Sequence, residues 1–184
     1  EYANCMRILF TGVSSFTGTW FARELAAAGN ELICPLRSSP DSYEGLRKAR
    51  IKLLPSACKI IPNAPFGSAS FISLLGEGIE LLCHHGAEMT NYRSQNFDAQ
   101  AALRNNTLCL SEVLANLQKS GCHGVVLTGT VFESDEGVGT VPLRAFSPYG
   151  LSKALTSQVF RFYCERAGMP LGKFVIPNPF GPFE

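Results

Sequence analysis

The residues best suited to chemistry in this chain are Tyr149 and Lys153, which stand four positions apart after Ser147 and Pro148. On a helix such a pair shares one face, with a rise of about 6 Å between the two residues. A free phenol has a pKa of about 10, and a neighbouring ammonium lowers that pKa by favouring the phenolate. We therefore expect Tyr149 to exchange a proton with a carbinol or carbonyl oxygen; an ordinary helix-surface pair is the alternative.

A glycine-bearing turn provides the first place where a cofactor could lie beside this pair. An apolar run over residues 7–10 predicts a buried strand, and apolar residues at helical spacing follow from Thr17 to Gly29. Between them, Gly12 and Gly18 fit a turn whose backbone N–H groups and helix N-terminus hold a pyrophosphate, although a plain strand-to-helix turn is the alternative. Ser15 replaces the middle glycine of the usual pattern. Its side chain either hinders the close approach of a phosphate or binds the phosphate through its hydroxyl.

The end of the second expected strand, residues 31–36, bears on the choice of dinucleotide. NAD-binding folds usually place an acid there, which binds the ribose 2′-hydroxyl. Here Arg37 and Ser38 follow Leu36, and a guanidinium suits a 2′-phosphate. The sequence therefore favours NADP over NAD, with NAD and a simple exposed loop arginine left open.

Two further strand ends carry polar or small residues. The run over residues 79–83 leads into His84, His85, Gly86 and Ala87. Adjacent histidines point in different directions and make a poor chelate, so we predict no metal, whereas the small pair after them lets a cofactor lie close to the backbone. The run over residues 125–127 ends at Thr128, whose hydroxyl stands where open α/β sheets bind ligands; a strand-end threonine without function is the alternative.

Strand and helix patterns alternate along the chain, which predicts an α/β fold with a doubly wound parallel sheet. Further strands are expected over residues 59–61 and 174–176, and helices over 42–54, 71–75, from Asn106 to about 120 and from Pro148 onward. In the last helix we expect the core stripe to be Leu155, Val159 and Phe162, with the Tyr149 and Lys153 edge facing a cleft or solvent. The acidic, glycine-rich segment 133–141 predicts a mobile loop.

Composition narrows the class of protein. The 184 residues are 46% hydrophobic and 17% charged with a net charge of +1, as expected for one globular domain without a nucleic-acid or membrane surface. The apolar runs fall short of the roughly 18 residues that span a bilayer. Seven cysteines, an odd number without C-x-x-C spacing, predict reduced thiols and a cytoplasmic protein.

Taken in order, these pieces resemble the N-terminal, Rossmann-like domain of extended short-chain dehydrogenases/reductases, in the NAD(P)-dependent epimerase/dehydratase family. The resemblance implies a nucleotide-sugar substrate and a catalytic set of Thr128, Tyr149 and Lys153, in which Lys153 also binds the nicotinamide ribose. It implies substrate contacts at Thr130 and Asn178. The cofactor-binding residues that it implies are Gly12, Ser14, Ser15, Phe16, Thr17, Gly18, Arg37, Ser38, Gly86, Ala87, Asn106, Tyr149, Lys153 and Pro177.

The same resemblance narrows the type of reaction that we expect. Family dehydratases carry two acids directly after the Thr128 position, where this chain has Gly129 and Thr130, so an epimerase or a ketoreductase is expected. The family continues into a smaller substrate domain after the point at which residues 1–184 end, so we expect these residues to be the NAD(P)-binding domain, with the substrate domain absent or truncated. A non-catalytic NAD(P)-binding sensor or scaffold is the alternative, and a homodimer stays open.

Overall fold

A computed structural model describes residues 5–76, 78–134, 136, 145 and 147–184. Within these residues, six parallel strands form one sheet in the order β3-β2-β1-β4-β5-β6. The strands are β1 (Arg7–Thr11), β2 (Glu31–Pro35), β3 (Cys58–Ile61), β4 (Leu81–His84), β5 (Gly124–Thr130) and β6 (Leu171–Ile176). The strand order reverses between β1 and β4, which is where doubly wound sheets bind their ligands. The predicted fold class is confirmed.

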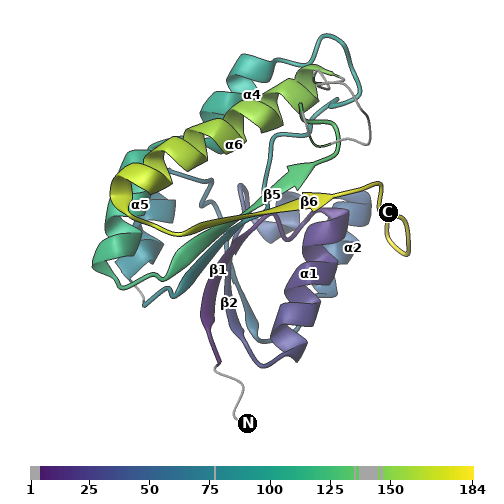
Figure 1. The fold of residues 1–184 in the computed structure, drawn as a ribbon. Helices are drawn as coiled ribbons and strands as arrows, with labels where there is room; N and C mark the ends of the chain where they lie inside the picture. Colours follow the sequence, from purple (N-terminus) through teal and green to yellow (C-terminus); the bar gives the residue numbers. More distant parts are fainter. Residues whose placement is uncertain (1–4, 77, 135, 137–144, 146) are drawn as a thin grey trace.

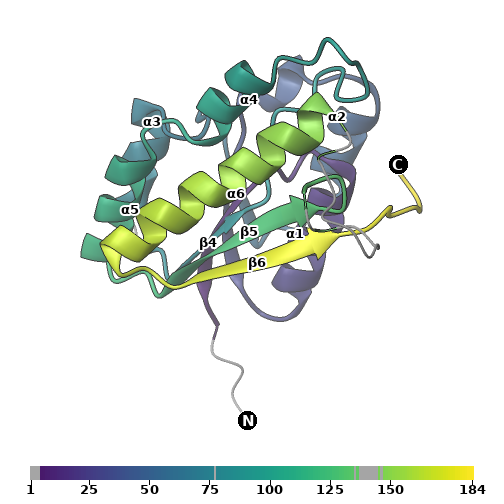
Figure 2. The ribbon, with the colours of Figure 1, turned by 45° about the horizontal axis from the view of Figure 1, so that its top comes forward.

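Helices cover both faces of the sheet (Figure 1). On one face lie α1 (Phe16–Ala27) and α2 (Gly45–Lys52), and on the other lie α4 (Ala99–Asn106), α5 (Leu110–Lys119) and α6 (Pro148–Ala167). The short α3 (Ala69–Ile72) lies beside α5, as the turned view in Figure 2 shows, and 3-10 turns span Pro40–Ser42 and Ser73–Gly76. Helix α6 crosses β5 and β6 diagonally, and its N-terminal end lies toward the carboxyl ends of these strands (Figure 2).

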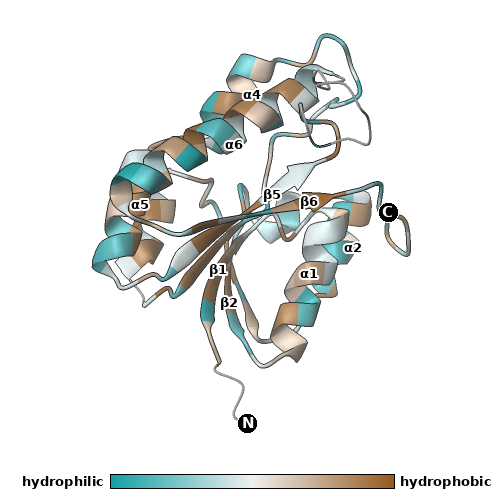
Figure 3. Cartoon of the chain, viewed as in Figure 1, coloured by the Kyte–Doolittle hydropathy of each residue, from teal (hydrophilic) through white to brown (hydrophobic). Residues whose placement is uncertain are grey.

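Two apolar cores, one on each side of the sheet, explain the continuous apolar runs of the strands (Figure 3). Successive residues of a strand point to opposite faces. In β1, Leu9 packs into the core beneath α5 and α6, while Ile8 and Phe10 pack into the core beneath α1 and α2. Strands buried on both faces read as unbroken apolar segments in the sequence.

The helix expected to begin at Asn106 begins four residues later. Asn106 is instead the last residue of α4, and Thr107 caps that helix with its hydroxyl on the carbonyl of Leu103. Cys109 then adopts a left-handed conformation with φ of 51°, which separates α4 from α5. Leu110, Val113, Leu114 and Leu117 are buried along α5, as their spacing predicted.

The buried face of α6 differs from the predicted stripe. Phe162 is 52% exposed, whereas Phe160, which stacks on His84 at 5.0 Å between ring centroids, and Cys164 are fully buried. This face continues back along the helix to Lys153 and Tyr149, which are both buried. The expectation that the pair faces away from the apolar seam is therefore wrong, and both side chains are poorly solvated.

The loop predicted over residues 133–141 falls mostly outside the described residues. Within this range Glu133 is described, and its side chain is only 1% exposed. All seven cysteines are free thiols. Among the helices described, none combines the length and apolarity needed to cross a membrane.

Candidate active site

The glycine turn after β1 lies against the end of β4, backbone against backbone. Gly12 has a φ of +85°, and a Cβ on it would lie 2.7 Å from the Cα of Gly86. A Cβ on Gly18 would lie 2.1 Å from the carbonyl oxygen of Gly12. Contacts this short exclude any side chain, so both glycines of the predicted turn are required by the packing of the turn itself.

Ser15, at the position usually held by the middle glycine, caps α1. Its hydroxyl donates to the Gly12 carbonyl at 2.8 Å and accepts from the Gly18 amide at 3.1 Å. Neither alternative considered from the sequence included this capping role. The cap uses the Gly18 amide, whereas the backbone amides of Phe16 and Thr17, also in the first turn of this twelve-residue helix, are not bound by Ser15. First-turn amides lack intrahelical partners, and a helix N-terminus attracts anions, so the turn fits a dinucleotide pyrophosphate.

Arg37 lies at the exposed end of β2, as predicted, and forms an ion pair with a residue that the sequence did not suggest. Its Nη1 is 2.7 Å from Oε2 of Glu88. Burial alone would raise the pKa of Glu88, but hydrogen bonds from Thr90 and the guanidinium of Arg37 lower it to about 2. A 2′-phosphate at this point would compete with a carboxylate for Arg37; the adjacent Ser38 is exposed.

The wall after β4 is held by polar contacts from β1 and α4. The Gly86 amide donates to the Thr11 hydroxyl at 2.8 Å, and the Glu88 amide donates to Oδ1 of Asn106 at 3.0 Å. Asn106 in turn donates to the Thr156 hydroxyl of α6 at 3.4 Å. The buried amide of Asn106 thus supports the segment that contains Gly86 and Ala87, in the place where the resemblance expects a cofactor wall.

The two histidines at the end of β4 point to opposite faces of the sheet, as expected for neighbours on a strand. His84 packs beneath α6, where its ring nitrogens contact the Thr11 hydroxyl and the Asn106 carbonyl, each at 3.1 Å. His85 points toward α1 and stacks on Phe10 with ring centroids 5.7 Å apart. The described residues contain no group of three or more side chains arranged to hold a metal ion.

Lys153 reaches across to the end of β5. Its ammonium donates to the carbonyl oxygen of Thr128 at 2.7 Å, and the side chain is almost completely buried. Burial lowers the pKa of Lys153 to about 8; the charge of Lys173 acts in the same direction, and the charge of Glu133 opposes it. The structure therefore brings together the lysine and the threonine that the sequence had placed 25 residues apart.

Tyr149 lies one helical turn before Lys153 in an aromatic cluster. Its ring is in edge contact with Tyr92 at 5.4 Å and with Phe97 at 5.9 Å between centroids. Burial, assisted by the charges of Glu133 and Tyr92, raises the pKa of Tyr149 to about 12. The expected lowering of this pKa by Lys153 is wrong for this structure, because the ammonium is engaged by Thr128 and burial dominates.

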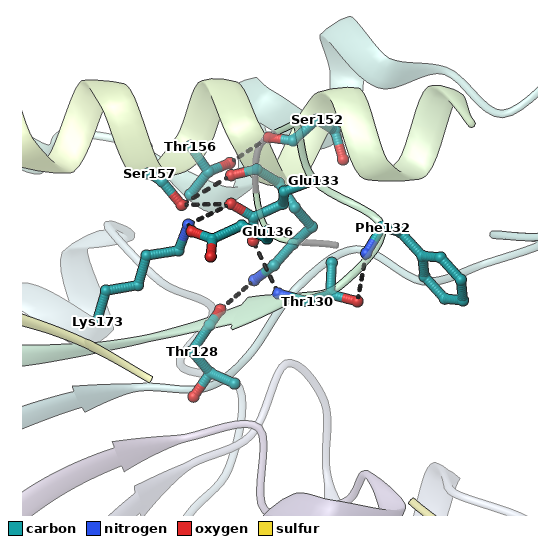
Figure 4. Close-up of polar contacts among 10 residues, drawn as sticks. Thr128, Thr130, Phe132, Glu133, Glu136, Ser152, Thr156, Ser157 and Lys173 are labelled. Carbon is teal, nitrogen blue, oxygen red and sulfur yellow. Dashed lines mark hydrogen bonds and ion pairs between the residues drawn. The ribbon is translucent and has the colours of Figure 1, made fainter. Parts of the chain in front are cut away.

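A buried charge network, absent from the sequence predictions, lies between the end of β5 and α6 (Figure 4). One carboxylate oxygen of Glu133 accepts from the Thr130 amide at 2.8 Å, and the other accepts from Ser157 at 3.1 Å and from Lys173 at 2.6 Å. Lys173 also pairs with Glu136. The sequence signal for this network is a lysine within an otherwise apolar strand, because a half-buried ammonium requires a carboxylate partner.

Two predicted substrate contacts have different surroundings. Thr130 is buried, and its hydroxyl accepts from the Phe132 amide at 3.4 Å, so the structure does not present it as an open contact. Pro177 and Asn178 are exposed just beyond β6. The segment after them returns to α1, where Nε1 of Trp20 donates to the Pro182 carbonyl at 3.2 Å.

The lowered pKa of Lys153 predicts a specific pH dependence of stability. Because the folded pKa is about 8 and the ordinary value is 10.5, the unfolded chain binds more protons between these values, and the free energy of unfolding rises with pH there. Relative to Lys153→Met, the wild type should gain up to about 3 kcal/mol between pH 7.5 and 10.5, measured by urea unfolding. Lys119→Met, at an exposed position, should follow the wild-type profile. Parallel profiles for wild type and Lys153→Met would contradict the lowered pKa.

Comparison with known proteins agrees with this architecture. The profile of the NAD dependent epimerase/dehydratase family matches residues 8–184. Among solved structures, UDP-glucuronic acid 4-epimerase from Bacillus cereus, in complex with NAD, is 20% identical with a TM-score of 0.76. The dTDP-glucose 4,6-dehydratase from Streptomyces venezuelae, with NAD bound, is 24% identical with a TM-score of 0.73. The Bordetella bronchiseptica enzyme WbmF, in complex with NAD+ and UDP, is 21% identical with a TM-score of 0.72.

The alignments cover nearly all of this chain and little more than half of each neighbour. They span 97%, 97% and 99% of this chain, and 59%, 58% and 52% of the respective neighbours. At these identities the likeness to solved structures establishes the fold, and a search of curated proteins found no match. The family profile, matched over almost the entire length, establishes the relationship: this chain belongs to the NAD dependent epimerase/dehydratase family.

Proposed function

We propose that this chain is the NAD(P)-binding part of an enzyme that epimerises or reduces a nucleotide sugar. The observation that carries the proposal is the contact between the Lys153 ammonium and the Thr128 carbonyl at 2.7 Å. It places an ammonium and a hydroxyl-bearing residue together at the end of β5, next to the strand-order reversal and the glycine turn. The nucleotide-sugar substrate is suggested by neighbours that contain UDP-glucuronic acid or UDP.

In this proposal the chain's own residues handle the proton and the orientation of the substrate. The bound nicotinamide supplies the hydride or accepts it. Because its pKa is raised to about 12, Tyr149 carries its proton at neutral pH and is suited to donate it to a ketone oxygen as that oxygen becomes a hydroxyl. The Thr128 hydroxyl orients the same oxygen, and Lys153 holds the end of β5 in place. Oxidation of a carbinol by the reverse route requires the pKa of Tyr149 to fall, as it does when a cation lies close by.

A single assay separates the two reactions. The full-length protein is incubated with UDP- and dTDP-sugars and with oxidised or reduced cofactor, while cofactor absorbance and sugar products are followed. A reductase consumes reduced cofactor in proportion to product, whereas an epimerase returns the cofactor and accumulates an epimer. Failure to convert any nucleotide sugar, with cofactor bound, would contradict the proposed function.

Arg37 leads us to propose a preference for NADP. We expect NADPH to bind at least tenfold more tightly than NADH, because a charge-assisted bond to the 2′-phosphate contributes roughly 1.5 kcal/mol or more. Arg37→Met should remove the difference, and Glu88→Gln, which releases Arg37 from its ion pair, should increase it. The dissociation constants of NADPH and NADH for the wild type and both variants are measured by titration of nucleotide fluorescence. Equal binding of NADPH and NADH by the wild type would contradict the preference.

The buried state of Tyr149 favours one alternative, a non-catalytic NAD(P) sensor or scaffold. A phenol whose pKa is about 12 is a weak proton acceptor at neutral pH. Such a protein binds a partner in a cofactor-dependent manner and converts no nucleotide sugar. For either function we propose a cytoplasmic location, because free thiols persist under reducing conditions.

A further inference from the structure

His85 connects the glycine turn to the candidate catalytic hydroxyl. Its Nε2 lies 3.0 Å from Oγ1 of Thr17, in the first turn of α1, and its Nδ1 lies 3.0 Å from Oγ1 of Thr128, in β5. The ring stacks on Phe10 and meets the edge of Phe21 at 5.5 Å between centroids. Both nitrogens of a well-packed imidazole are therefore used by hydroxyls that come from different elements.

The ring is neutral, so it carries one N–H and one lone pair. Burial lowers the pKa of His85 to about 3, and the charge of Lys153 acts in the same direction. If Nδ1 carries the proton, Thr128 accepts from His85 and its own proton is free for a substrate oxygen. If Nε2 carries the proton, Thr17 accepts a hydrogen bond from His85, and Thr128 donates its own proton to Nδ1 of His85.

We propose that His85 is a positioning residue that sets the direction of the Thr128 hydroxyl and couples it to Thr17 at the cofactor turn. This inference rests on the proposed function, because it assigns Thr128 to the substrate oxygen. The tautomer with the proton on Nδ1 is the one that leaves Thr128 able to donate to a carbonyl oxygen. Thr17 then donates to Nε2, so that a chain of three hydrogen-bonding groups extends from α1 to the reacting oxygen.

Two substitutions separate the hydrogen bonds from the packing of the ring. His85→Phe keeps an aromatic ring between Phe10 and Phe21 but removes both bonds; His85→Asn can restore a donor near the Nδ1 position. We expect His85→Phe to lower kcat about tenfold or more, with the NAD(P) dissociation constant changed less than twofold, and His85→Asn to recover part of kcat. In a Thr128→Val background, His85→Phe should have almost no further effect, because the hydroxyl that it orients is gone.

A spectroscopic test does not require turnover. The chain has three histidines, so the ring nitrogens of His85 can be assigned by 15N NMR through the loss of its signals in His85→Phe. We expect a neutral ring with the proton on Nδ1 in the wild type, and a shift of the proton to Nε2 in Thr128→Val, where Thr17 is the remaining partner.

The outcomes distinguish this inference from the proposed function. A wild type that binds NAD(P) but converts no sugar contradicts the proposed function, while the NMR result still tests the tautomer. An active wild type whose kcat is unchanged by His85→Phe overturns the positioning role, as do additive effects of His85→Phe and Thr128→Val. A ring that carries its proton on Nε2 in the wild type also overturns it.

Discussion

Tyr149→Phe is expected to lower the turnover of nucleotide sugar by about 10²- to 10⁴-fold, the range that a positioned general acid or base contributes. The change removes one oxygen and keeps the ring, so the edge contacts with Phe97 and Tyr92 persist and the fold should be unaffected. Cofactor affinity should change little, because α1 and the segment after β4 form the expected cradle. Steady-state kinetics, together with NAD(P)H fluorescence titration, measure both quantities.

The matched control is Tyr92→Phe, the same chemical change in the same aromatic cluster. The Tyr92 hydroxyl accepts from Nε of the exposed Arg93 at 3.0 Å, so its loss should alter turnover less than about twofold. If Tyr149→Phe retains wild-type turnover, Tyr149 has no part in proton transfer. If it loses turnover and cofactor affinity together, the hydroxyl supports the cofactor site instead.

The fold could be predicted from the sequence because its strands are buried on both sides. Unbroken apolar runs such as Ile8 to Phe10, alternating with helical patterns, specify a parallel sheet. The glycines were predictable for a related reason, since Gly12 and Gly18 stand where any Cβ would overlap backbone atoms. In both cases a local pattern is the direct consequence of close packing.

The buried face of α6 could not be read from hydrophobicity alone. The apolar stripe that included Phe162 was a reasonable prediction, but the face that packs on the sheet also contains Lys153 and Thr156. These polar groups are buried because Thr128, Asn106 and other residues from distant parts of the chain supply their hydrogen bonds. Partners that distant in sequence leave no periodic signal.

The direction of the Tyr149 pKa shift was missed for a similar reason. The prediction that Tyr149 and Lys153 lie one turn apart on a helix was correct, but their spacing in the sequence does not indicate how much water reaches either group. The aromatic neighbours Phe97 and Tyr92 come from the segment before α4, whose packing no local pattern predicts. Burial therefore outweighs the effect expected from the ammonium.

Glu133→Gln should lower the free energy of unfolding by about 3 kcal/mol, the lower end of the cost of removing one partner from a buried ion pair. Glu133 is 1% exposed and is the charge partner of Lys173, while its other oxygen holds the Thr130 amide. Glutamine can still accept from that amide, so the loss reports the missing charge. Urea unfolding measures it.

Glu136→Gln is the matched control, because Glu136 pairs with the same lysine but its side chain is 29% exposed. A carboxylate that keeps contact with water can be solvated without its partner, so this pair contributes about 1 kcal/mol at most and the variant should remain close to wild type. Equal losses for the two variants would mean that burial does not distinguish the two carboxylates.

The double variant Glu133→Gln with Lys173→Met keeps an acceptor for the Thr130 amide and tests whether the charge of Glu133 serves only Lys173. Removing both charges of a buried ion pair together is often close to neutral, so the double variant should regain wild-type stability if the pair is self-contained. However, the charge of Glu133 raises the pKa of Lys153, which is about 8, by more than the charge of Lys173 lowers it, so removing both charges still lowers this pKa. We therefore expect the double variant to remain less stable than wild type at pH 7, where Lys153 is charged, and to approach it near pH 10, where Lys153 is neutral. A stability difference that does not change with pH would show that Lys153 does not depend on Glu133.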